Sequence, residues 1–268
     1  MRKHLIWLLL CPIALFATEY APWYERNLEL RPKATLLYQT YNSVQSPHRP
    51  KRHPSNDIFL DLSLSTYLMA FGVELETSFA HTRHQRQLNW DDLSLTGRYQ
   101  LLDDVTGDPI SLTAGATIRQ VLKLARHDVS CFYHGGLEGE FHLAAGVETS
   151  CAQFWVSRLW GMLGLGIADL GSPWIRANLE WNHNCYDLYG ASLYLNTLWG
   201  LGRNNLRLKD FKGYGPIAHR SADAGIRYGH TFEFGGTLGV GIARRIYARN
   251  CPRNVNQVYI CFIYPFGL

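Results

Sequence analysis

Two groups of side chains in this sequence have the chemistry of catalytic or cross-linking residues. His219 and Ser221 are separated by one residue, and an imidazole beside a hydroxyl can take its proton and create a nucleophile. Cysteine occurs six times, without the C-x-x-C spacing that is typical of zinc sites. We therefore expect no metal site and no cofactor. Whether the His–Ser pair or the thiols act depends on the elements that position them.

The first residues have the pattern of an export signal. Arg2 and Lys3 precede an apolar stretch over 5–17, which is too short to span a bilayer as a helix. We predict a signal peptide over residues 1–17 with cleavage after Ala17; a buried N-terminal helix is the alternative. The mature chain would then fold outside the cytoplasm, where disulfides can form.

Alternation of apolar and polar residues dominates the chain after Pro32. In residues 72–79, for example, Val73 and Leu75 alternate with Glu74 and Glu76. A period of two gives a strand one apolar and one polar face. About twelve segments show this pattern, and each is near the ~9–11 residues that a tilted strand needs to cross a bilayer. These segments are 33–42, 57–66, 69–80, 93–102, 110–120, 136–147, 153–167, 173–182, 188–201, 217–229, 231–243 and 257–268.

The connections between these segments alternate in length. Long linkers mostly alternate with short turns, as in barrels of the outer membrane; 168–172 is the exception. The long linkers are 44–56, 81–92, 121–135, 202–216 and 244–256. A soluble β-sandwich would also alternate, but soluble strands average about 5–6 residues. We predict an all-β fold, a single antiparallel transmembrane β-barrel of about 12 strands over 33–268, with a periplasmic lead-in over 18–32.

The C-terminal segment has one apolar face that runs to the end of the chain. Every second residue is apolar or aromatic: Ile260, Phe262, Tyr264, Phe266 and Leu268. This face resembles the C-terminal β-signal of bacterial outer-membrane β-barrel proteins. The resemblance implies the bacterial outer membrane as the location and the barrel-assembly machinery as a partner during biogenesis.

The polar face of the predicted strands is rich in charge. In a barrel it would line the lumen, whereas in a soluble sandwich it would face water. The candidate lumen residues are Glu74, Glu76, Arg98, Arg119, Glu138, Glu140, Arg176, Glu180, Asp223 and Arg227. The two signs are close to balanced, which predicts weak ion selectivity. Twelve strands lie between small filled barrels and open porins of about 16–18 strands, so the pattern leaves open whether the lumen conducts.

The long linkers are basic. If the termini are periplasmic, these linkers face outward, where arginine can bind phosphate through paired donors. The candidate anion-binding residues are Arg49, Lys51, Arg52, Arg203, Arg207, Arg244, Arg245, Arg249 and Arg253. The expected partners are outer-membrane lipid and lipopolysaccharide; a solvated rim beside lipid headgroups is the simpler alternative. We expect no nucleic acid as a partner of an exported barrel.

Five cysteines remain after the predicted cleavage. Cys151 and Cys185 fall in two neighbouring periplasmic turns and could form a disulfide, whereas Cys131 and Cys251 fall in outward linkers and Cys261 has lumen parity. An odd number leaves one thiol for another envelope protein. The alternative is that all five are incidental thiols.

The His–Ser pair resembles the His-x-Ser arrangement of outer-membrane phospholipases and lipid A deacylases. Those enzymes act on lipid, so their pair must face the bilayer. Here Ala222 and Ala224 have the lipid-facing parity, so His219 and Ser221 point inward. We therefore predict no enzyme but a porin-like channel for passive diffusion of small solutes. A non-conducting surface adhesin or a disulfide-linked structural envelope protein is the second hypothesis, and a lipid hydrolase is the third.

Overall fold

The computed structural model describes residues 20–24, 26–46, 49–151, 154–185 and 187–267. Twelve long strands form one antiparallel sheet that closes where β1 pairs with both β2 and β13. They are β1 (Glu29–Val44), β2 (Lys51–Leu68), β3 (Phe71–His81), β4 (Asn89–Leu102), β5 (Ser111–Val121), β6 (Leu137–Cys151), β7 (Phe154–Ala168), β8 (Trp174–Cys185), β9 (Tyr189–Gly200), β10 (Arg220–Thr231), β11 (Thr237–Arg249) and β13 (Asn256–Ile263). The predicted twelve-stranded barrel is confirmed.

Short elements complete the fold. Strands β12 (Pro252–Arg253) and β14 (Phe266–Gly267) pair with the two ends of β1. Helix α1 (Lys123–Arg126) and the single turn η1 (Leu208–Asp210) lie in the connections. Among the described residues, no helix is both long and apolar enough to span a membrane.

The wall of the barrel is apolar outside and charged inside. Along β3, Phe71, Val73 and Leu75 are 60%, 48% and 47% exposed, whereas Glu74 and Glu76 are each 3% exposed. A protein surrounded by water would have the opposite arrangement, because exposed apolar area is unfavourable in water. Lipid removes that cost, since its acyl chains are themselves apolar. The chain is therefore a membrane-spanning barrel.

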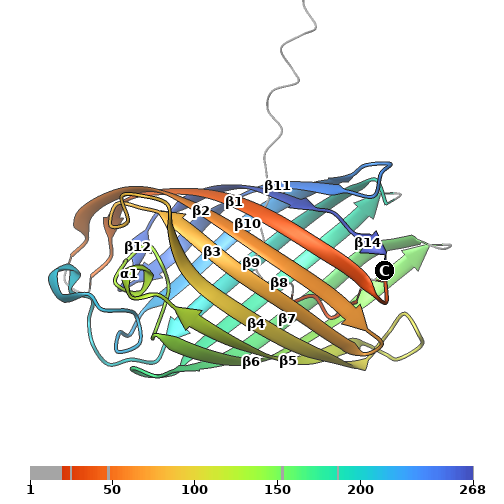
Figure 1. Cartoon of the computed structure of the whole chain (residues 1–268), viewed down its shortest axis with the longest axis horizontal. Helices are drawn as coiled ribbons and strands as arrows, with labels where there is room; N and C mark the ends of the chain where they lie inside the picture. Colours follow the sequence, from red (N-terminus) through yellow and green to blue (C-terminus); the bar gives the residue numbers. More distant parts are fainter. Residues whose placement is uncertain (1–19, 25, 47–48, 152–153, 186, 268) are drawn as a thin grey trace, which may run out of the picture.

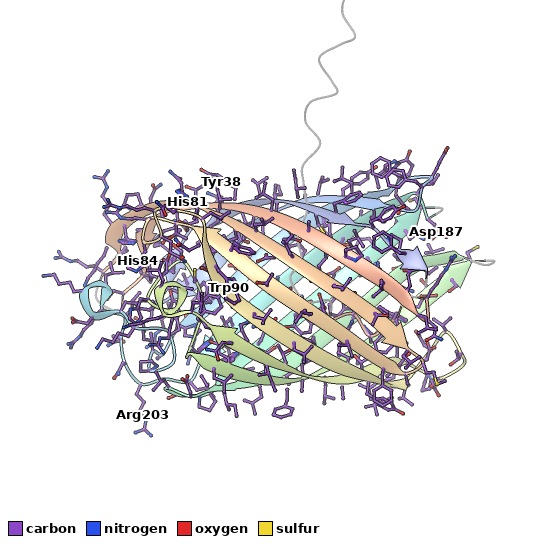
Figure 2. All side chains as sticks on the ribbon, viewed as in Figure 1. Tyr38, His81, His84, Trp90, Asp187 and Arg203 are labelled. Carbon is purple, nitrogen blue, oxygen red and sulfur yellow. The ribbon has the colours of Figure 1, made fainter. Side chains whose placement is uncertain are left out.

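The two ends of the barrel differ. Long connections, 122–136 and 201–219 among them, lie at the end on the left of Figure 1, and the C-terminal β14 lies at the other end. Figure 2 shows Arg203 at the first end and Asp187 at the opposite end. Long loops face outward and short turns face the periplasm in barrels of this class. We refer to these ends as the outer end and the inner end.

Several strands are longer than the sequence pattern indicates. Strand β2 starts at Lys51 instead of 57, and β11 continues to Arg249 instead of ending at 243. Backbone pairing persists there, because β1 pairs with β2 out to Val44 and Lys51. The linkers predicted over 44–56 and 244–256 are thus shorter than expected, and part of their basic residues belong to strands that extend outward.

The lead-in predicted over 18–32 is also corrected. Strand β1 begins at Glu29, residues 26–28 before it are exposed, and residues 20–24 lie inside the barrel. Trp23 is 5% exposed and packs with Ala144, Trp160 and Met162 of the inner wall. The burial of this aromatic ring is favourable, which draws the segment inward. The predicted signal peptide over 1–17 lies outside the described residues.

Candidate functional site

All ten sequence-predicted lumen residues have their side chains on the inner face of the barrel. Those of Glu74, Glu76, Arg98, Glu138, Glu140 and Glu180 are buried, and those of Arg119, Arg176, Asp223 and Arg227 are half-buried. Charges removed from water need partners, because an isolated buried charge is very costly. Many of these side chains accordingly form ion pairs inside the lumen.

Arg119 on β5 lies among three carboxylates. Its guanidinium nitrogens are 4.0 Å from Glu76, 3.8 Å from Asp92 and 3.7 Å from Glu138. The hydroxyl of Tyr133, from the connection between β5 and β6, donates to the same Asp92. The sequence pattern did not predict Asp92 as a lumen residue, because its strand was expected to begin one residue later.

The other ion pairs follow the wall around the lumen. Arg176 lies 3.3 Å from Glu140, and Lys33 lies 3.5 Å from Glu74. Arg227 on β10 pairs with Glu180 on β8, so this ion pair spans the intervening strand β9. Arg98 instead donates to the hydroxyl of Tyr67 at 3.0 Å and to the carbonyl of Ala21 at 3.2 Å, so it holds the segment inside the barrel.

Arg245 is a correction to the predicted anion-binding residues. It lies on β11 with its side chain in the lumen, is 5% exposed, and donates to both oxygens of Asp223 at 2.7 and 2.8 Å. The reason is that β11 continues past 243, so alternation turns Ala243 and Arg245 inward and Arg244 outward.

The other predicted basic residues stay at the outer end. Arg253 is half-buried in β12 and donates to Gln45 at 3.3 Å. The remaining side chains are exposed: Arg49, Lys51, Arg52, Arg203, Arg207, Arg244 and Arg249.

Residues 20–24, the N-terminal segment, cross the lumen. The ring of Tyr20 packs edge-on against His142 at 4.9 Å, and Arg176 donates to its hydroxyl at 3.2 Å. Trp23 donates from its indole nitrogen to Asp104 at 2.8 Å, in the turn between β4 and β5. The segment therefore narrows the lumen between its inner end and its middle.

Two polar chambers lie along the lumen. The outer chamber, about 410 Å³, has four carboxylates and three arginines in its wall. They are Asp61, Glu76, Asp92, Asp223, Arg119, Arg176 and Arg245. The inner chamber, about 340 Å³, has four basic side chains and two carboxylates: Arg31, Lys33, Arg158, Arg227, Glu180 and Asp187. Tyr20 and Asn178 line both chambers, so the chambers meet at these residues.

The outer end is covered by two connections, 127–136 and 201–219, which we call the outer cap. They share an apolar cluster that includes Val129, Tyr214 and Ile217. They also meet at His134 and His219, whose Nε2 atoms are 3.0 Å apart. A packed cap of this kind restricts entry from outside.

The two cap histidines are in surroundings that favour the neutral ring. Burial, together with the positive charges that His134 and Arg245 would add, lowers the pKa of His219 to about 2. Burial also lowers the pKa of His134, although the carboxylate of Glu138 acts in the opposite direction. Trp174 stacks on the His134 ring with centroids 3.9 Å apart.

The His219–Ser221 pair does not form. His219 points inward and its Nε2 faces His134, while Ser221 lines the outer chamber. Among the described residues, no hydrogen bond joins the imidazole to the Ser221 hydroxyl. The arrangement therefore lacks both the bilayer-facing position and the base–nucleophile contact that lipid hydrolysis would need.

The predicted disulfide is corrected as well. Cys151 and Cys185 are free and exposed, whereas Cys131, Cys251 and Cys261 are free and buried. Strand β7 separates β6 from β8, which places Cys151 and Cys185 about two strand spacings apart, roughly 10 Å, beyond the ~7 Å that a disulfide spans.

Within the described part of the chain, no group of three or more His, Cys, Asp or Glu residues could hold a metal ion.

Comparisons with known proteins identify the fold. No family model and no curated protein matches the sequence. The chain is similar to the COG4313 outer membrane channel from Pseudomonas putida F1, with a TM-score of 0.68 and 11% identity over 94% of this chain and 100% of that one. It is also similar to the NanC porin, with a TM-score of 0.56 and 7% identity over 86% of this chain and 98% of that one. Together with the apolar outer wall, this fold defines a bacterial outer-membrane β-barrel.

Proposed function

We propose that this chain is a narrow channel through which small polar solutes diffuse passively across the outer membrane. The supporting observation is the pair of polar chambers that meet at Tyr20 and Asn178. In a barrel with a purely structural role, packed side chains would fill the lumen and leave no chambers of this size. Both similar structures are described as a channel or a porin, which agrees with this proposal.

The size and charge of the chambers suggest the kind of solute. Volumes of about 410 and 340 Å³ are at the lower end of the ~300–1,000 Å³ typical of small-molecule pockets. The outer chamber has a small excess of carboxylates, and the inner chamber an excess of basic groups. A solute with both charges, or with neither, would meet no strong barrier in either chamber. A large ion of one sign would be opposed in one of them.

The experiment is to reconstitute the mature protein in planar bilayers and to measure conductance, followed by liposome swelling with neutral and zwitterionic solutes of increasing size. Heat-modifiable migration in electrophoresis establishes that each preparation is a folded barrel. We expect small, reproducible conductance steps and swelling that stops at low solute mass. A folded barrel that is silent in both assays would refute the proposal.

The second hypothesis is a non-conducting surface protein. The outer cap and the N-terminal segment favour it, since both reduce the open cross-section. Its disulfide-linked form would have to use the exposed Cys151 or Cys185, because Cys131 and Cys251 are buried. A silent, folded barrel in the experiment above is the result that would support the surface protein.

A further inference from the structure

A groove of about 780 Å³ lies on the lipid-facing wall of the barrel. Its sides consist of outward apolar side chains, such as Leu179, Leu193 and Ile226, which are 53%, 50% and 45% exposed. They belong to neighbouring strands, β8, β9 and β10. The groove is therefore open to the acyl chains of the bilayer, and it shares Tyr194 and Gln257 of the barrel wall with the outer chamber.

Small side chains make the groove deep along β10. Ala224 stands between Leu195 on β9 and Arg244 on β11 in the same row of the sheet. One step further outward, Ala222 pairs with Thr197 on β9 and with Tyr247 on β11. Because alanine projects little from the wall, the groove is deep at Ala224, and the Ala222–Tyr247 pair bounds it towards the outer end of the barrel.

Three arginines lie on the outward face at this groove or between it and the outer end of the barrel. Arg220 and Arg249 are direct cross-strand partners on the outward face, and Arg244 lines the groove itself. Among the described residues, no carboxylate lies within 4 Å of any of the three. The Arg220 guanidinium lies over the ring of Trp199 at 6.0 Å. Like charges directly opposite each other destabilise a strand pair, so this pair favours an anion between them.

The geometry points to a binding site for lipid A, the phosphorylated and multiply acylated glycolipid of the outer leaflet. One acyl chain would lie in the groove over Ala224, and a phosphate would accept hydrogen bonds from Arg220 and Arg249. Arginine suits this role because its planar fork binds phosphate oxygens in pairs. The long loops place these arginines at the outer leaflet, where such a phosphate is found. The site is on the outer wall and does not depend on whether the lumen conducts.

The test is native mass spectrometry of the full mature barrel in mild detergent, titrated with lipid A. The wild-type protein should retain one lipid A molecule. The double variant Arg220→Gln/Arg249→Gln should bind at least about tenfold more weakly, the loss expected when one charge-assisted contact is removed. The variant Ala224→Phe, which fills the groove, should also weaken binding. The matched control is Arg203→Gln/Arg207→Gln, which removes the same charge from an exposed loop.

Three further measurements keep the result interpretable. Heat-modifiable migration shows that each variant is folded, and unchanged conductance of the Arg220→Gln/Arg249→Gln variant separates this site from the proposed channel function. The wild type and that variant should bind lipid A without its phosphates with equal affinity. The inference is overturned if the double variant binds lipid A as tightly as the wild type, or if phosphatidylethanolamine is retained equally well.

Discussion

Acidification should loosen the outer cap through its buried histidine pair. At neutral pH both His134 and His219 are neutral, and their Nε2 atoms meet between the two connections. Protonation of either ring would place a charge in an apolar cluster, and protonation of both would place two like charges side by side. Lowering the pH from 7.5 to 5 is therefore the perturbation.

The magnitude follows from the pKa of His219. In the open cap the ring would have its ordinary pKa of about 6.5, whereas burial lowers the pKa to about 2 in the closed cap. Below about pH 6.5 the open cap binds more protons than the closed cap. The closed cap therefore has its full stability above that pH and loses stability as the pH falls below it. Each pH unit costs about 1.4 kcal/mol, so at pH 5 the closed cap loses about 2 kcal/mol, which is roughly a thirtyfold change in its equilibrium. Glu138 reduces the contribution of His134 and leaves that of His219 unchanged.

The assay is single-channel recording at both pH values, with His219→Gln as the matched variant because its side chain is neutral throughout. The fraction of time in the most conducting state should rise at pH 5 in the wild type and stay constant in the variant. Trypsin cleavage at Arg203 and Arg207, in the connection that forms the cap, gives a second readout that needs no conductance. An equal response of wild type and variant, in both readouts, would refute the role of the histidine pair.

Three other perturbations test the remaining contacts. Trp23→Ala removes an aromatic anchor whose truncation costs about 3–5 kcal/mol, so the N-terminal segment should leave the lumen and conductance should rise; unchanged conductance would contradict the constriction. Asp223→Asn leaves Arg245 buried beside a neutral partner, and urea unfolding in detergent should show destabilisation of about 3–5 kcal/mol, whereas a loss below about 1 kcal/mol would show that the pair contributes little. A maleimide should label Cys151 and Cys185 in the folded protein and the buried thiols only after denaturation, with the same monomer band under reducing and non-reducing conditions.

The barrel wall could be predicted because its signal is local and repeated. Apolar and polar residues alternate on every strand, so parity alone separates Phe71 from Glu74. The end of the last strand shows the limit of this rule. Strand β13 stops at Ile263, and β14 resumes only at Phe266, because Pro265 has no N–H for the ladder and interrupts the segment predicted over 257–268.

The side chains that fill the lumen are held by contacts between residues far apart in the chain. The alternation of apolar and polar residues does not predict such contacts. Nothing in the neighbourhood of Trp23 indicates that it meets Trp160, and nothing around His134 indicates His219. Arg245 was assigned to a loop because a run of arginines resembles a solvated linker. Only the pairing of β10 with β11 shows that its partner is Asp223.

The placement of charge explains how the same strands can give one barrel a charged lumen and arginines on its outward face. Along β11, Arg245 faces inward and is neutralised by Asp223, while its neighbour Arg244 faces outward and has no carboxylate within 4 Å among the described residues. A step of one residue thus moves an arginine from the lumen to the lipid-facing surface. Substitution of Arg245 should therefore change stability and conductance, and substitution of Arg244 should change only the interaction with lipid.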